Sequence, residues 1–266
     1  MARRFDPRTL PGFGAIAALA FALLYLPLIV LVAYSFNAGD LIGRWEGLSW
    51  RWYAQALDNA AIQDAALRSL VLALVAAALS TALAVLAALA TTRADQFRPR
   101  HAIAAVVNQP LVVPEIVMAV ALLLLFSMVR QATGLSGMGY LLAAHVTFCI
   151  PFAYLPVRAR LEGMDANLER AAADLYASPL SVFRRITLPL LAPGILAGFM
   201  LAFVISLDNV VISQFIKTAG QETLPTYMLG QLRRGISAEI YAVSTMLVGL
   251  SLLILTLSFL VNRRRP

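Results

Sequence analysis

Two short polar sequences interrupt long apolar stretches of this 266-residue chain, and they are the residues best suited to bind a charged solute. Glu115 follows Pro114, and Asp208-Asn209 lies in the apolar run that begins near Leu190. A charge at the centre of a bilayer costs roughly 2.5–3.5 kcal/mol on insertion scales, so intramembrane acids usually line a polar path. Glu115, Asp208 and Asn209 are therefore candidate substrate-pathway residues, and carboxylates in a path favour a cation.

Both acids also have a simpler interpretation. About 20 helical residues counted from Leu190, enough to cross a bilayer, already reach Asn209. Asp208 could therefore lie at the outer interface, whereas Glu115, placed directly after a proline, could cap or pack a helix.

Other reactive residue types form no catalytic or metal-binding motif. The only lysine, Lys217, has no glycine before it, whereas a phosphate loop requires G-x-x-x-x-G-K-[ST]. His101 and His145 lie outside any zinc motif, and we expect His145 to be a hydrogen-bonded packing residue. The single cysteine, Cys149, excludes an internal disulfide. We predict no catalytic residue, no metal site and no cofactor in this chain.

The apolar stretches that carry these residues predict an all-α membrane protein. The chain is 61% hydrophobic and 13% charged, against about 25% charged residues in soluble domains. A transmembrane helix needs about 20 mostly apolar residues. Six segments qualify, and we treat them as one transmembrane domain over 1–266: 13–36, 69–90, 105–129, 136–157, 190–215 and 240–262.

The distribution of basic residues predicts the orientation of the spans. Of the 21 Lys and Arg residues, fourteen lie on the side of the two termini and seven on the other. Cytoplasmic loops carry the excess of Lys and Arg, so we expect both termini to be cytoplasmic. The basic residues stand in short clusters between apolar runs, which indicates contact with a lipid bilayer and no binding of nucleic acid.

The segment 158–189 between the fourth and fifth spans is long for a connection in a helical bundle, which favours a functional loop. Asn167 is a candidate N-cap of one short helix, and Ser178-Pro179 begins a second, with proline at the first helical position. We expect the second helix to end before Thr187. Two short helices joined by a tight turn would form a compact knob, here meaning residues 167–186.

The loop resembles the E-A-A-x3-G-x9-I-x-L-P motif (the EAA motif) of the permease subunits of ABC importers. Alanines 171 and 172 and the sequence Ile186-Thr-Leu-Pro189 fall in register. Arg170 stands where the motif has glutamate, with Glu169 beside it, and Tyr176 stands where the motif has glycine. Over roughly 57–261, segments 112–119, 206–209 and 232–240 also resemble the second permease of spermidine/putrescine-type importers.

The resemblance implies a type I ABC importer permease fold with a cytoplasmic coupling helix, in a bacterial inner membrane. It implies as partners an ATPase dimer that binds the ATP and Mg, a second homologous permease and a periplasmic substrate-binding protein. The residues that it assigns to ATPase coupling are Glu169, Arg170, Ala171, Ala172, Asp174, Leu175, Tyr176, Ala177, Ser178 and Pro179. It implies transport of a small cationic amine such as putrescine or spermidine.

Several alternatives stay open at this point. Asn209 stands where the family often has a second aspartate, so a less charged amine, including an aminobutyrate-like compound, is an alternative substrate. The basic loop could simply lie against anionic lipid. A secondary transporter would be expected to show internal repeats and a midplane site of its own, and the sequence shows neither. A scaffold subunit without a transport path is a third interpretation.

Overall fold

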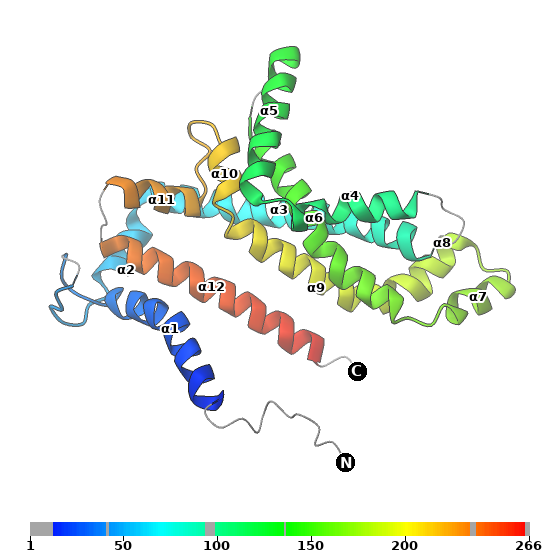
Figure 1. Cartoon of the computed structure of the whole chain (residues 1–266), viewed down its shortest axis with the longest axis horizontal. Helices are drawn as coiled ribbons and strands as arrows, with labels where there is room; N and C mark the ends of the chain where they lie inside the picture. The colour runs from blue at the N-terminus through cyan, green and yellow to red at the C-terminus, as the bar shows by residue number, and fades with distance from the viewer. Residues whose placement is uncertain (1–12, 41–42, 94–98, 136, 235–237, 264–266) are drawn as a thin grey trace. The chain divides into compact units, whose positions relative to one another are not determined.

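The computed structural model describes residues 13–40, 43–93, 99–135, 137–234 and 238–263, which are almost entirely helical (Figure 1). Within those ranges six helices are long and apolar enough to cross a membrane, as the sequence predicts. These six segments are Gly14–Tyr34, Ala60–Thr92, Glu115–Thr133, Met138–Glu162, Pro179–Leu207 and Ala238–Thr256.

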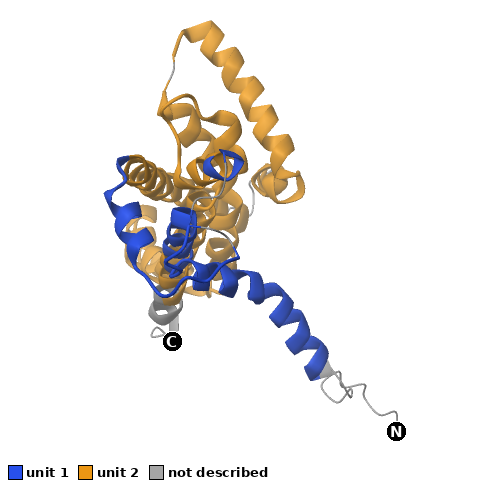
Figure 2. Ribbon diagram, turned by 90° about the vertical axis from the view of Figure 1, so that its left-hand side faces the viewer, with its two compact units in different colours: residues 1–60, 231–249 blue, residues 61–230, 250–266 orange. Residues whose placement is uncertain are grey.

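The chain forms two compact units, coloured separately in Figure 2. Unit 1 comprises Met1–Ala60 and Gln231–Gly249, and unit 2 comprises Ala61–Gly230 and Leu250–Pro266. The prediction of one domain over 1–266 stays a prediction.

Unit 1 contains α1 (Phe13–Tyr34), α2 (Arg51–Asp58) and the first part of α12 (Ala238–Arg263). Trp52 of α2 is buried against Ala238 and Ala242 of α12. The indole Nε1 of Trp52 donates a hydrogen bond of 2.8 Å to the carbonyl of Asn37, which satisfies the polar end of the buried ring.

Unit 2 contains the elements that carry the candidate site residues. They are α3 (Ala60–Thr92), α4 (Arg100–Val112), α5 (Glu115–Thr133), α6 (Met138–Glu162), α7 (Asn167–Asp174), α8 (Pro179–Val182), a π-helical turn (Phe183–Thr187), α9 (Leu188–Leu207), α10 (Val211–Ile216) and most of α11 (Leu224–Arg234). Among the described residues, the only β-type pairing is one isolated bridge between Asn37 and Leu48, in unit 1.

The third predicted span, 105–129, is wrong as one continuous helix. Val113 is extended (φ −79°, ψ 132°) and separates α4 from α5. Steric conflict with the ring of Pro114 disfavours the helical conformation for the residue before it. The apolar helix that can cross the membrane begins after that proline, at Glu115.

The other predicted boundaries also shift. The second span begins at Ala60 instead of residue 69, and the fourth continues to Glu162 instead of ending at 157. The fifth does not reach 215, because the helix breaks between Leu207 and Val211. The first and sixth agree within a few residues, and position 136 lies outside the described residues.

Helices α6 and α9 lie side by side in unit 2 and approach closely at two glycines (Figure 1). A Cβ atom added to Gly194 would lie 2.7 Å from Cβ of Arg160, and one added to Gly198 would lie 2.7 Å from the carbonyl oxygen of Ala153. Small residues let helix backbones approach in this way inside membranes. The two glycines therefore set the distance between the helices that flank the knob.

Replacing Gly198 with alanine is predicted to destabilise unit 2. The new methyl group would overlap a backbone oxygen that cannot move alone, and overpacking of this kind costs about 1–3 kcal/mol. Thermal unfolding of the purified protein in detergent should show a lower midpoint. Gly139→Ala is the matched control, because that helical glycine has open space around its added Cβ. Equal midpoints for the two variants would contradict the packing argument.

Candidate functional site

The predicted knob is present in unit 2, and Ala166, one residue before Asn167, holds the N-cap position of its first helix without a side-chain cap bond. The backbone N–H of Asn167 donates to Oδ1 of Asp165 at 2.9 Å, and Asn167 is the first residue of α7. The prediction that Asn167 is the N-cap was therefore wrong. A carboxylate at this end also interacts favourably with the positive end of the helix dipole.

The turn after α7 is a complete Schellman motif with Tyr176 at its left-handed position. Tyr176 has a φ of 60°. Its N–H donates to the carbonyl of Ala173 at 2.9 Å, and the N–H of Ala177 donates to the carbonyl of Ala172 at 3.1 Å. Glycine is the usual residue at this position, because it has no Cβ to conflict with the backbone. The glycine of the motif that the loop resembles thus falls where the turn needs a positive φ.

The second helix of the knob begins as predicted and continues further than predicted. Ser178 Oγ accepts the N–H of Ser181 at 3.4 Å, and Pro179 occupies the first helical turn. The chain then passes through the π-helical turn directly into α9. In this turn the N–H of Leu188 donates to the carbonyl of Phe183, five residues earlier. The wider turn before Pro189 accommodates the proline ring and its missing N–H, so the helix continues past Thr187. The predicted helix end before Thr187 was therefore wrong.

Glu169 fastens the knob to the rest of unit 2. Its Oε2 lies 3.0 Å from Nε of Arg93, and each of the two side chains is only about a fifth exposed (20% and 21%). Thr187 donates its hydroxyl to Oε1 of Glu169 at 2.8 Å. One carboxylate therefore joins α7 to the end of α3 and to the π-helical turn, and it points into the molecule.

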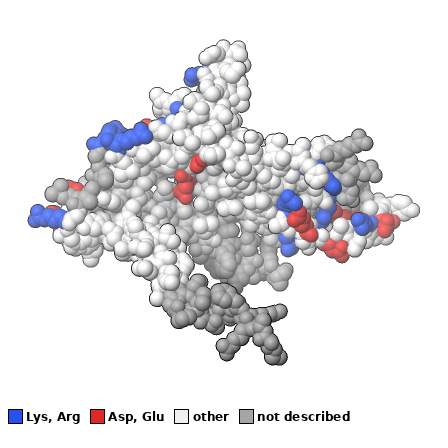
Figure 3. All heavy atoms as spheres, viewed as in Figure 1, with Lys and Arg blue, Asp and Glu red and all other residues white. Residues whose placement is uncertain are grey.

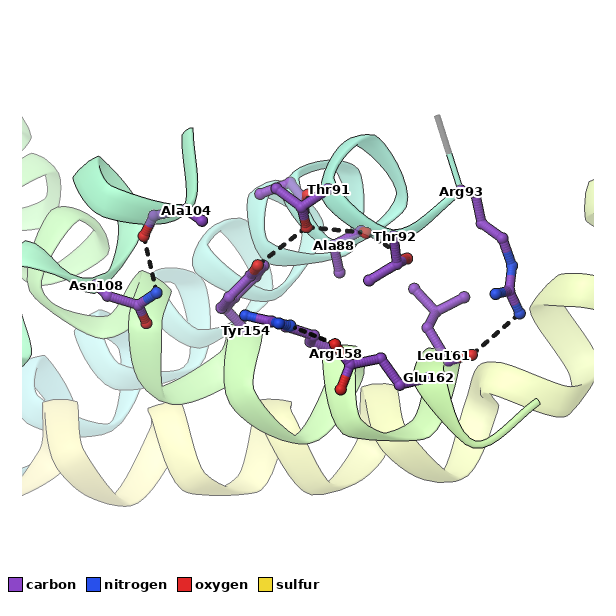
Figure 4. Close-up of polar contacts among 11 residues, drawn as sticks. Ala88, Thr91, Thr92, Arg93, Ala104, Asn108, Tyr154, Arg158, Leu161 and Glu162 are labelled. Carbon is purple, nitrogen blue, oxygen red and sulfur yellow. Dashed lines mark hydrogen bonds and ion pairs between the residues drawn. The ribbon is translucent and has the colours of Figure 1, made fainter. Parts of the chain in front are cut away.

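Arg93 also holds the end of α6, which makes it the centre of this anchor (Figure 4). One of its terminal nitrogens donates to the carbonyl of Leu161 at 3.0 Å. The last carbonyls of a helix have no partner inside the helix, so a guanidinium is a favourable cap. Nearby, Thr91 and Tyr154 share a hydrogen bond of 2.9 Å, which adds a second link between α3 and α6.

The ten residues assigned to ATPase coupling divide into an anchored side and an exposed side. Glu169, Ala172 and Ala177 are half-buried. The exposed members are Arg170, Ala171, Asp174, Leu175, Tyr176, Ser178 and Pro179. Figure 3 shows charged side chains gathered at the end of unit 2 that carries α7 and α8. Leu175 and Tyr176 are the most exposed large apolar residues of the knob, at 82% and 98%, and Leu168 and Leu180 are also exposed.

A second polar group lies where α9 breaks. The amide nitrogen of Asn209 donates to Oε1 of Glu115 at 2.5 Å. Oδ1 of Asn209 accepts the N–H groups of Ile212 and Ser213, at 3.0 and 3.4 Å. Asn209 therefore caps α10 and ties it to the first turn of α5. Glu115 is the first residue of α5 and makes no cap bond, so of its alternative roles it has the packing one.

His145 of α6 joins the two sides of the same break. Its Nδ1 lies 2.8 Å from Ser206 Oγ, before the break, and its Nε2 lies 2.9 Å from Ser213 Oγ, after it. His145 is buried, as expected of a hydrogen-bonded packing residue. Both ring nitrogens have partners, which is what a buried imidazole requires.

Asp208 stands apart from this buried network. It is exposed, and it is the C-cap residue of α9. A carboxylate at the C-terminus of a helix is disfavoured by the negative end of the helix dipole. Asp208 therefore lies exposed at the end of α9, with Ser251 beside its carboxylate, whereas Glu115 and Asn209 bind each other.

Sequence reasoning missed Arg93, Thr187 and the serines at positions 206 and 213. Arg93 was counted only as a cytoplasmic basic residue, and nothing in its local sequence indicates a partner 76 positions later. The serines left a weak signal, because they lie within a few residues of Asp208 on either side of the break. In the described part of the chain, no three or more His, Cys, Asp or Glu residues gather as metal ligands would.

Glu169→Gln is predicted to loosen the knob, because the half-buried guanidinium of Arg93 would lose its charged partner and Thr187 would donate to a neutral group. Hydrogen bonds to charged groups contribute about 1.5–3 kcal/mol, so local opening of α7 should increase tenfold or more. Hydrogen exchange of residues 167–177 measures this. The control is Glu162→Gln, which removes an exposed pair with Arg158 (2.8 Å) worth a few tenths of a kcal/mol. Equal protection in both variants would show that the anchor does not hold the knob.

Known proteins resemble this chain over most of its length. Residues 80–265 match the model of a family described as "Binding-protein-dependent transport system inner membrane component". The putrescine transport system permease protein PotI of Escherichia coli K12 is 39% identical over 237 residues, 88% of this chain and 84% of PotI. The spermidine/putrescine transport system permease protein PotC of Haemophilus influenzae is 39% identical over 251 residues, 94% and 96% of the two chains.

Solved structures agree on the fold. A chain of a bacterial ABC transporter that imports the acidic polysaccharide alginate superimposes with a TM-score of 0.74, at 15% identity, covering 94% of both chains. A chain of the MetNI methionine ABC transporter gives a TM-score of 0.63 at 19% identity, covering 81% of this chain and 98% of that chain. The fold is thus that of ABC transporter permeases, and the chain belongs to the family of binding-protein-dependent transport system inner membrane components.

Proposed function

We propose that this chain is the permease subunit of an ATP-binding-cassette importer for a small cationic amine such as putrescine or spermidine. It forms half of the translocation pathway and pairs with a second, homologous permease. A separate ATPase dimer binds the knob, a periplasmic binding protein delivers the solute, and both termini lie in the cytoplasm of a bacterium. The names of the relatives at 36–39% identity support the amine class.

The observation that carries the proposal is the anchored knob with its exposed apolar tip. The only lysine of the chain, Lys217, is outside any phosphate loop and lies 3.2 Å from Glu222. Energy from ATP must therefore enter through contact with another protein. The knob suits that contact, because a force on its tip reaches α3, α6 and α9 through Glu169, Arg93 and Thr187.

A mechanism follows from this arrangement. Closure of the ATPase dimer would displace the two knobs, and the spans attached to each knob would move as rigid bodies to alternate access. Packed helices transmit such a displacement because their interiors have little free volume. The solute would pass exposed Asp208, whereas Glu115 and Asn209 keep the break between α9 and α10 in shape.

Cysteine crosslinking tests the ATPase contact. In a Cys149→Ala background, cysteines at Ala171, Asp174 and Leu175, all on the exposed side of the knob, should crosslink to cysteines in the ATPase surface, and nucleotide should change the yield. Leu48→Cys is the control. One span precedes Leu48 and four precede the knob, so in the proposed topology Leu48 lies on the opposite face of the membrane. No crosslink from any knob position, or an equal yield from Leu48→Cys, would refute the contact.

Asp208→Asn tests the amine pathway. The substitution keeps the size of an exposed side chain and removes its charge, so we expect intact folding and a rise in KM for putrescine of about tenfold, equivalent to roughly 1.4 kcal/mol. Glu115→Gln is the control, because its remaining carbonyl still accepts the amide of Asn209. Uptake into proteoliposomes, with binding protein and ATPase present, is the measurement. Unchanged transport of every cationic amine by Asp208→Asn would exclude a substrate role for this residue.

A further inference from the structure

Tyr176 occupies a backbone conformation that its side chain disfavours. Its φ of 60° makes it the one non-glycine residue with a positive φ in the described part of the chain. The other left-handed C-cap position in unit 2, after α5, is Gly134, with a φ of 70°. Bulky residues rarely adopt this region, and where they do the strain often marks a functional position.

No side-chain contact in the described part of the chain compensates for this strain. The Tyr176 side chain is 98% exposed, so the ring packs against no part of the described structure. The two hydrogen bonds of the turn use backbone atoms only, and glycine would form them equally well. A change to glycine would therefore favour folding, which means that the ring is a cost to the isolated chain.

The neighbouring residues make the ring part of a small apolar projection. Leu175, directly before it, is 82% exposed. Arg170 and Asp174 on the preceding turn are also exposed, so the projection has charged residues of both signs beside it. An apolar centre with a polar rim is the pattern of a protein interface, and an acidic residue there disfavours anionic lipid.

We propose that the ring of Tyr176, together with Leu175, is an anchor that inserts into an apolar recess of the ATPase and restricts this permease to ATPases whose recess accepts an aromatic ring. This inference rests on the proposed function and adds to it a determinant of partner choice. Tyrosine offers a large contact area and has few rotatable bonds to immobilise, so it commonly dominates interface energies. The Schellman turn presents the ring on a fixed backbone, and Glu169 and Arg93 hold that backbone in place.

The test compares Tyr176→Gly, Tyr176→Ala and Tyr176→Phe in the complete permease pair in lipid nanodiscs. Affinity is measured for the ATPase that co-purifies with the wild-type chain, and hydrogen exchange of residues 167–177 is measured in parallel. For Tyr176→Gly we expect stronger exchange protection but affinity at least tenfold weaker. Tyr176→Phe should bind within about threefold of wild type. Trp50→Ala, an exposed aromatic residue beyond the first span, is the control and should change neither quantity.

A second arm tests selectivity with an ATPase whose own permease has glycine at this motif position. The Tyr176→Gly variant should bind that ATPase more tightly than the wild-type chain does. Equal or tighter binding of the cognate ATPase by Tyr176→Gly would overturn the inference, as would a Tyr176→Phe variant as weak as Tyr176→Gly. If the wild-type chain bound no ATPase at all, the proposed function would fail instead, so the two failures are distinguishable.

Discussion

The contact between Glu169 and Arg93 is the constraint on which the arrangement of the knob depends. A loop outside the membrane has few apolar contacts to hold it. The second helix of the knob is continuous with α9 through the π-helical turn, so α7 is the part that needs an anchor. Here one carboxylate receives a guanidinium from the end of α3 and a hydroxyl from the π-helical turn, and the same guanidinium caps α6. Because both charges are largely shielded from water, separating them is costly. These contacts tie the knob to the end of α3, to α6 and to the π-helical turn that leads into α9.

A few polar contacts also stabilise the break between α9 and α10. Asn209 takes over two N–H groups that a continuous helix would have satisfied, and His145 bridges the serines on either side. In lipid an unsatisfied backbone group costs several kcal/mol, so a broken helix survives only where protein groups replace the missing bonds. Of the neighbours Asp208 and Asn209, only Asn209 takes part in these bonds, and Asp208 is exposed.

Elements with local chemical signals could be predicted from the sequence. Apolar length predicted six spans, and Ser178-Pro179 predicted the start of α8. Pro114 and Glu115 were visible as an interruption of the third span, and the restriction on the residue before a proline turns that interruption into a helix break at Val113. The pairing of Arg93 with Glu169 was out of reach, because it joins residues far apart in sequence. The left-handed Tyr176 was out of reach for another reason, since tyrosine by itself argues against a positive φ.

We propose that the anchored knob converts ATP hydrolysis by a partner protein into movement of the spans. The most direct measurement is the ratio of amine imported to ATP hydrolysed by the complete transporter in proteoliposomes, for the wild-type chain and for Glu169→Gln. The account predicts that the variant still binds the ATPase and hydrolyses ATP, while imported amine per ATP falls severalfold. An unchanged ratio, with α7 shown by hydrogen exchange to be loosened, would contradict it.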